Sequence, residues 1–280
     1  MTKKNRLRLA LCLPLFVFLI LGFDTRLKVV KYSIQSEKIH APVRMVLITD
    51  LHSCYYGAGQ RELVDAIHRQ KPDLVLYAGD ILDDELPDDN TIVLLKALQG
   101  KYPAYYVTGN HEFWSRKVEQ KIAVMRQHGV TVLRGEWETL ATANGQTLNI
   151  CGVDDPDVDV YTRPLRPFQE QLQSLQNAAE NGAFTILLSH RPELIEKYAR
   201  YSFDLVLSGH AHGGQWRVPK LLNGFYSPNQ GFFPKYVAGP YTRGNMTLLV
   251  SRGLAKESTR VPRFYNRPEL LVVDVQPQMP

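Results

Sequence analysis

Short apolar runs alternate along the chain with stretches in which apolar residues recur every three or four positions. The short runs predict β-strands and the amphipathic stretches predict α-helices. Their alternation is typical of a layered α/β fold. We expect central strands at Met45–Thr49, Leu74–Ala78, Ala104–Thr108, Thr185–Ser189 and Leu205–Ser208, and helices at Gln60–Gln70, Thr91–Leu98, Arg116–His128, Pro167–Asn177 and Glu193–Tyr198.

Further strands are expected outside this central set. Polar and apolar positions partly alternate in Leu27–Ile34, and short apolar runs occur at Thr131–Leu133, Thr147–Val153, Met246–Ser251 and Leu270–Val275. The stretch Trp216–Tyr241 is rich in glycine, proline and aromatic residues, which favours a long loop packed on its own side chains. A hydrophobic rim that faces a bilayer is the alternative interpretation of this stretch.

The N-terminus has the layout of a signal anchor. Leu9–Phe23 is uncharged and apolar, and the residues before it carry the cations Lys3, Lys4, Arg6 and Arg8. No small-residue cleavage site follows, which favours an uncleaved single-pass anchor over a removed signal peptide. We therefore expect an anchor at 1–24, a juxtamembrane segment at 25–43 and a catalytic domain at 44–277. The N-terminal cations favour an inner-membrane protein whose catalytic domain lies outside the cytoplasm.

Composition adds little to this organisation. A chain of 280 residues with 44% hydrophobic residues can form one well-buried domain. The net charge of +5 suits an anionic partner such as a phosphate ester, but several of the cations flank the apolar N-terminal run. No nucleic-acid module and no protein partner is indicated. The three cysteines form no CxxC pair, so a cysteine-based zinc site is not expected.

Chemically active side chains follow each of the five central strands. In an open α/β sheet, ligands bind beyond the carboxyl ends of the strands, so these side chains are expected to converge there. Within the two i, i+2 pairs, an extended backbone would project both side chains to one side. Mixed oxygen and nitrogen donors suit two divalent ions of Mn, Fe, Zn or Co, and disfavour calcium. The residues are Asp50, His52, Asp80, Asn110, His111, His190, His210 and His212.

The same residues stand in motifs that resemble those of calcineurin-like metallophosphoesterases. In chain order these are Asp50-Leu51-His52, Gly79-Asp80-Ile81-Leu82-Asp83, Gly109-Asn110-His111-Glu112, His190 and Gly209-His210-Ala211-His212. The resemblance covers about Met45 to Gly214 and implies a layered sandwich of two mixed β-sheets flanked by helices. Gly213-Gly214-Gln215, Ser251-Arg252-Gly253-Leu254 and the apolar N-terminus are similar to the bacterial, membrane-anchored YkuE/YaeI-type phosphodiesterase subgroup.

Roles for individual residues follow from this resemblance alone. It implies that Asp50, His52 and His212 hold one metal ion and that Asn110, His190 and His210 hold the other. Asp80 would bridge the two ions. His111 would contact the phosphate and stabilise or protonate the leaving oxygen, and Asp83 would orient His111.

The function implied is hydrolysis of a phosphodiester or pyrophosphate bond by a hydroxide that bridges two divalent ions, with manganese favoured. By analogy with the subgroup, the substrate would be lipid-linked, such as a UDP-diacylglucosamine-like molecule. Two alternatives stay open. One is a general nucleotide or nucleic-acid phosphodiesterase, and the other is a non-catalytic phosphate-binding module.

Overall fold

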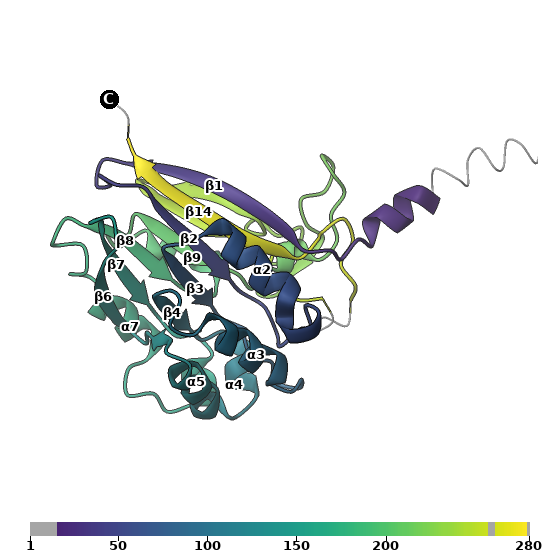
Figure 1. The fold of residues 1–280 in the computed structure, drawn as a ribbon, viewed down its shortest axis with the longest axis horizontal. Helices are drawn as coiled ribbons and strands as arrows, with labels where there is room; N and C mark the ends of the chain where they lie inside the picture. Colours follow the sequence, from purple (N-terminus) through teal and green to yellow (C-terminus); the bar gives the residue numbers. More distant parts are fainter. Residues whose placement is uncertain (1–15, 257–260, 279–280) are drawn as a thin grey trace, which may run out of the picture.

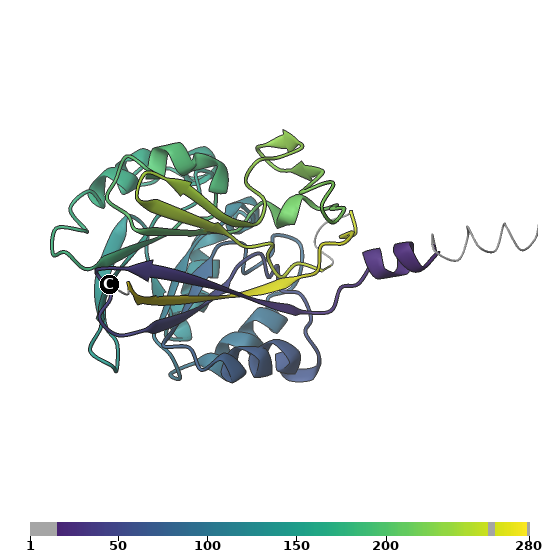
Figure 2. The same ribbon diagram turned by 90° about the horizontal axis from the view of Figure 1, so that it is seen from above.

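The computed structural model describes residues 16–256 and 261–278. Two six-stranded β-sheets pack face to face, and helices cover their outer faces (Figure 1). Viewed from above, the two sheets appear as separate layers (Figure 2). Apolar side chains from both sheets, including Leu47, Leu76, Ile150 and Leu207, form a buried core between the layers.

The first sheet is built mainly from the N-terminal half of the chain. Its strand order is β1-β14-β2-β3-β4-β5, and only the β14–β2 pair is antiparallel. The central strands are buried along their length because helices cover the face that points away from the second sheet. The strands are β1 (Lys28–Ser36), β14 (Glu269–Pro277), β2 (Val43–Ile48), β3 (Leu74–Ala78), β4 (Ala104–Val107) and β5 (Thr131–Val132).

The second sheet has the order β12-β13-β9-β8-β7-β6. Its outer pairs β12–β13 and β6–β7 are antiparallel hairpins, whereas the pairs between them are parallel. The strands are β12 (Gly239–Arg243), β13 (Met246–Val250), β9 (Leu205–Ser208), β8 (Phe184–Leu188), β7 (Thr147–Gly152) and β6 (Glu136–Ala141). A separate small hairpin joins β10 (Tyr226–Ser227) to β11 (Gly231–Phe232).

The helices bury one face against the sheets. In α2, for example, Leu63 and Ile67 recur at helical spacing and are fully buried. The α-helices are α2 (Arg61–Gln70), α3 (Asp89–Leu98), α4 (Asn110–Trp114), α5 (Val118–Gln127), α6 (Val158–Tyr161), α7 (Phe168–Ser174) and α8 (Ile195–Tyr198). Short 3₁₀ turns occur at Ala58–Gln60, Pro192–Leu194 and His212–Gly214.

The expectation of two mixed sheets flanked by helices is confirmed. All the strands and helices expected from the sequence are present, with bounds shifted by a few residues. The expected strand in the juxtamembrane segment is β1, and it pairs with β14 over Lys28–Ser36. The sheet therefore begins before residue 44, where the sequence placed the start of the catalytic domain.

The anchor expected at 1–24 lies largely outside the described residues, which start at residue 16. Residues 16–22 are helical and extend away from the sheets in both views (Figures 1 and 2). In the part of the chain that the structure describes, we find no helix whose length and apolar character would let it cross a bilayer. The anchor stays a prediction.

Candidate metal centre

Five strand ends, three from the first sheet and two from the second, meet at one edge of the sandwich. β2, β3 and β4 run parallel to one another, as do β8 and β9, so each group delivers its carboxyl ends together. The turns that follow these strands carry all the residues implicated by the sequence. Most of these side chains are buried, the exception being partly exposed His111.

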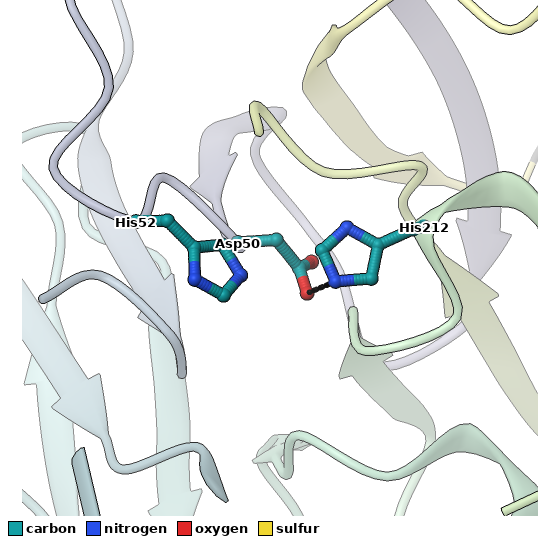
Figure 3. Close-up of side chains that lie close together, drawn as sticks. All are labelled: Asp50, His52 and His212. Atoms are coloured by element: carbon teal, nitrogen blue, oxygen red, sulfur yellow. Dashed lines mark ion pairs between the residues drawn. The ribbon is translucent and has the colours of Figure 1, made fainter. Parts of the chain in front are cut away.

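A first cluster combines the turns after β2 and β9. Donor atoms of Asp50, His52 and His212 all lie within 4.8 Å of one another. Figure 3 shows the Asp50 carboxylate between the two imidazole rings. Asp50 Oδ1 lies 3.6 Å from His212 Nε2, a spacing at which one ion could contact both atoms.

A second cluster lies beside the first and contains Asp80, His190 and His210. Asp80 Oδ2 is 3.0 Å from His190 Nε2 and 3.7 Å from His52 Nε2. Asp80 thus lies between the two clusters, where a bridging carboxylate would have to be. Asp50 Oδ1 lies 4.0 Å from His190 Nε2, so the clusters are neighbours.

Two buried atoms in the centre test whether these residues suit metal ions. Within the described residues, His52 Nε2 and Asn110 Oδ1 have no hydrogen-bond partner. A polar atom that is buried without a partner is costly, and coordination to a cation removes that cost. The donors are oxygens and imidazole nitrogens without sulfur, which fits a pair of divalent ions of the Mn, Fe, Zn or Co type. The assignment of each ligand stays a prediction.

The backbone at the centre is unusual. Asp50, His52, Asp80, His210 and His212 all have positive φ, between 45° and 64°. Such left-handed conformations are uncommon for residues other than glycine and cluster at functional sites. This corrects the expectation that the Asp50–His52 and His210–His212 pairs lie in extended backbone. Tight turns bring each pair together instead.

Two glycines allow the strand ends to approach closely. Gly79 has φ 84°, and a Cβ atom there would lie 2.5 Å from His190 Nδ1. A Cβ atom at Gly109 would collide with the Asp80 carboxylate. Glycine is therefore required at both positions for Asp80 and His190 to meet.

The Glu112 carboxylate fastens the turn after β3 to α4. Its two oxygens accept hydrogen bonds from the backbone N–H groups of Gly109, Asp80, Ile81 and Leu82, at 2.7 to 3.0 Å. The side chain is fully buried. Glu112 thereby fixes the backbone that carries the predicted bridging ligand.

Asp83 and Asp84 both lie near His111, but their closest contacts differ. Asp83 Oδ2 lies 2.8 Å from His52 Nδ1 but 3.6 Å from His111 Nδ1. His111 Nδ1 instead pairs with Asp84 Oδ1 at 2.5 Å. Asp83 therefore orients a predicted metal ligand, and its neighbour Asp84 orients His111. The sequence contained both aspartates, but spacing alone could not distinguish their directions.

The structure also contains a hydrogen-bond network around His210 that the sequence did not predict. Asn229 Oδ1 lies 2.8 Å from His210 Nε2 and accepts a hydrogen bond from Arg191 Nη1 at 2.5 Å. Arg191 is held in turn by Asp155 through two hydrogen bonds. Because an oxygen accepts the Nε2 proton, His210 presents Nδ1 toward the second cluster. The only sequence signal was that Arg191 directly follows His190.

Burial and charge divide the four buried imidazoles into two pairs. Burial lowers the pKa of His210 and of His212 well below the usual value, so both stay neutral and keep a lone pair for metal. Burial acts in the same direction on His52 and His190, but nearby carboxylates outweigh it. Asp83 and Asp80 raise the pKa of His52, and Asp80 and Asp50 bring the pKa of His190 to about 10.

Burial and neighbouring charges also shift the pKa values of the two buried carboxylates, Asp50 and Asp80. Burial raises the pKa of Asp50 above its usual value; the charge of His190 opposes this shift, and that of Asp80 adds to it. Burial also acts to raise the pKa of Asp80, but His190 and His111 hold it well below its usual value. Without metal ions, the negative charge is therefore concentrated on Asp80 at the middle of the centre.

Comparison with known proteins gives a consistent picture. The chain is 31% identical over 244 residues to the uncharacterized metallophosphoesterase YkuE of Bacillus subtilis, covering 82% of this chain and 77% of that one. It is 29% identical over 243 residues to the phosphodiesterase YaeI of Escherichia coli, covering 84% and 83%.

Solved structures agree at the level of the fold. The NAD nucleotidase NadN of Haemophilus influenzae superposes with a TM-score of 0.55 at 18% identity, over 77% of this chain and 46% of that one. At this identity the likeness shows the fold alone. A family model described as calcineurin-like phosphoesterase matches residues 43–214, the region that contains every predicted ligand. The chain therefore belongs to the calcineurin-like phosphoesterases, a family of phosphoester hydrolases that use a dinuclear divalent-metal site.

Proposed function

We propose that this protein hydrolyses a phosphodiester or pyrophosphate bond with two divalent ions, manganese foremost. The observation that carries the proposal is the position of Asp80, within 3.7 Å of imidazoles from both ligand clusters. Asp50, His52 and His212 would hold one ion, and Asn110, His190 and His210 the other. When bound, the ions supply positive charge for the phosphate oxygens and a water activated as a nucleophile near neutral pH.

His111 is the group placed to serve the leaving oxygen. Its side chain is 18% exposed, unlike the buried ligands around it, and its ring lies 4.3 Å from that of His52. With Nδ1 paired to Asp84, the other ring nitrogen, Nε2, would serve as the proton donor to the departing oxygen. Trp114, whose ring centroid is 4.6 Å from that of His111, limits the movement of the imidazole.

The substrate class that we propose is a lipid-linked phosphodiester or pyrophosphate, such as a UDP-diacylglucosamine-like molecule. Support comes from the relative YaeI, which carries the name phosphodiesterase, and from exposed aromatic side chains in the segment that follows His212. The test is hydrolysis by one manganese-loaded sample of a lipid-linked nucleotide pyrophosphate, a simple nucleotide, an oligonucleotide and an aryl phosphodiester.

Preferential turnover of the lipid-linked compound supports the proposal. Equal or faster turnover of the nucleotide or oligonucleotide would contradict the substrate class while leaving the reaction intact. A sample that binds divalent metal and phosphate but hydrolyses none of these compounds would instead indicate the phosphate-binding module.

We also propose that residues 1–24 anchor the chain in the inner membrane, with the catalytic domain outside the cytoplasm. The support is the apolar run Leu9–Phe23 behind four cations. Protease added to the outside of spheroplasts should degrade the catalytic domain. If the domain is protected until the membrane is lysed, it lies on the cytoplasmic side instead. Release of the full chain by salt alone would contradict anchoring.

A further inference from the structure

One end of the molecule carries a continuous set of exposed and half-buried aromatic rings. They come from the N-terminal helical segment, the segment after His212 and the residues before β14. Both views place the N-terminal helix and the yellow-green segment after His212 toward the same end (Figures 1 and 2). We call this set the aromatic surface, and it consists of Phe18, Phe23, Trp216, Phe225, Phe232, Phe233, Phe264 and Tyr265.

Ring contacts join the three segments into one patch. Phe264 contacts both Phe18 and Trp216, with ring centroids 5.7 and 6.1 Å apart. Phe225 continues the series, 6.3 Å from Trp216 and 5.8 Å from Phe233. The loop thus packs on its own rings, but Phe232 and Phe233 remain 65% and 70% exposed. A contiguous exposed apolar patch usually marks a site of interaction.

A cationic pocket adjoins the aromatic surface. Its volume is about 450 Å³, and Tyr265 belongs to both features. Of the described residues that line it, none is acidic, although Glu269 pairs with Arg252 from outside the lining. The lining residues include the cations Arg217, Lys220 and Arg252 and the apolar or aromatic residues Leu221, Leu222 and Tyr265.

The pocket holds more positive charge than its surroundings neutralise. Burial, together with the neighbouring Arg252, lowers the pKa of Arg217 to about 10. The Arg217 guanidinium is held by the Asn223 side chain and the Gly213 carbonyl, both uncharged. A bound anion would offset this repulsion between cations.

We propose that the aromatic surface and the cationic pocket together dock on an anionic phospholipid bilayer. The aromatic rings would enter the interfacial region, which tryptophan and tyrosine favour, while the pocket would hold a lipid phosphate. A bilayer is the occupant that fits both the apolar rings and the cations beside them. Phe18 and Phe23 also belong to the apolar run Leu9–Phe23, so a membrane that this run enters would meet the surface directly.

Backbone hydrogen bonds join the aromatic surface to the turn that carries His212. The Gly214 carbonyl accepts hydrogen bonds from the backbone N–H groups of Trp216 and Phe225, at 2.7 and 2.8 Å. Gly214 lies two residues after the predicted ligand His212. Docking would therefore place the centre close to the depth of lipid head groups, where the phosphate of a lipid-linked substrate lies. This consequence rests on the proposed function, but the docking itself can be tested without turnover.

The experiment uses the full chain and vesicles of phosphatidylcholine and phosphatidylglycerol in which some acyl chains are brominated. Bromine quenches tryptophan on contact, and the chain has three tryptophans, Trp114, Trp137 and Trp216. We expect the bound wild type to be quenched and Trp216→Phe to lose most of that quenching. The proposal would be overturned if the wild type and Trp216→Phe were quenched equally. It would also be overturned if the protein bound without quenching or did not bind to the vesicles.

Matched variants distinguish membrane docking through the aromatic surface from nonspecific hydrophobic or electrostatic adsorption to the vesicles. Phe232→Ser/Phe233→Ser should lose most of the Trp216 quenching, whereas Val160→Ser/Leu165→Ser, which alters equally exposed apolar residues elsewhere, should not. Lys220→Gln should weaken quenching by vesicles with phosphatidylglycerol more than Lys117→Gln does. Indistinguishable behaviour within either pair would contradict the assigned surface. Circular dichroism of each variant ensures that folding is intact.

Discussion

Asp80 and His111 are close in space, yet replacing them should have different effects on metal content and turnover. Asp80 lies between both ligand clusters, so Asp80→Ala should remove both metal ions and almost all activity. His111 Nδ1 pairs with Asp84, and we propose that the ring serves the leaving group. His111→Ala should therefore keep the metal and lower kcat by about 10²- to 10⁴-fold. Metal analysis beside kinetics on an aryl phosphodiester distinguishes the two effects.

Full activity in His111→Ala would remove the role assigned to this residue. Asp84→Asn is a useful companion, since it changes only the group that orients the His111 ring. It should lower kcat with little effect on metal content. Loss of metal in Asp84→Asn would mean that the Asp84–His111 pair supports the ligands rather than the leaving group.

Asn229 tests whether a residue from outside the five motifs controls a ligand. Its oxygen accepts a hydrogen bond from His210 Nε2, so Asn229→Ala frees the imidazole to rotate or change tautomer. Loss of a partner of this kind lowers metal affinity by about 10- to 100-fold. Calorimetric titration with manganese measures this loss, and Asn245→Ala, in an exposed turn, serves as the control. Unchanged affinity in Asn229→Ala would show that this hydrogen bond does not control the metal affinity of His210.

At the scale of the element, the turn between β3 and α3 depends on Glu112. Replacing Glu112 by glutamine turns one acceptor oxygen into an amide that faces backbone N–H donors. Two buried donors then lose their partner, which should lower the free energy of unfolding by about 2 to 5 kcal/mol. Urea denaturation measures this, and Glu170→Gln on the exposed face of α7 is the control. A change below about 1 kcal/mol would show that the turn holds without Glu112.

The elements also show what could be read from the sequence. Strands such as β3 and β9 were predicted residue by residue because buried runs bounded by Asp80 or His210 leave little ambiguity. Strand β6, by contrast, is mostly exposed and carries no apolar pattern, so it was not expected. The predicted ligands could be proposed from the sequence because each follows a strand, and the structure brings them together. Asn229 and Asp84 were missed because their roles depend on turn geometry and long-range contacts that no local periodicity records.

At the scale of the whole molecule, metal binding should be coupled to pH. Burial opposes protonation of His190, but Asp80 and Asp50 raise its pKa to about 10, above the unfolded value near 6.5. In the metal-free protein, the stabilisation from protonated His190 is complete below about pH 6.5 and is lost as pH rises toward 10. A metal ion needs the neutral imidazole, so binding must release that proton.

Manganese affinity should therefore rise by up to about tenfold per pH unit between roughly pH 6 and 9 for each proton displaced. Titration calorimetry in buffers of different ionisation enthalpy measures the released protons directly. His52, whose pKa is also raised, adds to the effect. Affinity that does not change with pH over this range would contradict metal binding through His190.

The pairing of β1 with β14 joins the beginning of the described chain to its end. Lys28–Ser36 forms a nine-residue parallel ladder with Glu269–Pro277, and β14 also separates β1 from β2. During synthesis, the first strand emerges from the ribosome long before its partner has been made. The first sheet can close only after β14 has been made, so a chain cut short before Glu269 would have two unpaired strand edges, open to proteolysis and aggregation.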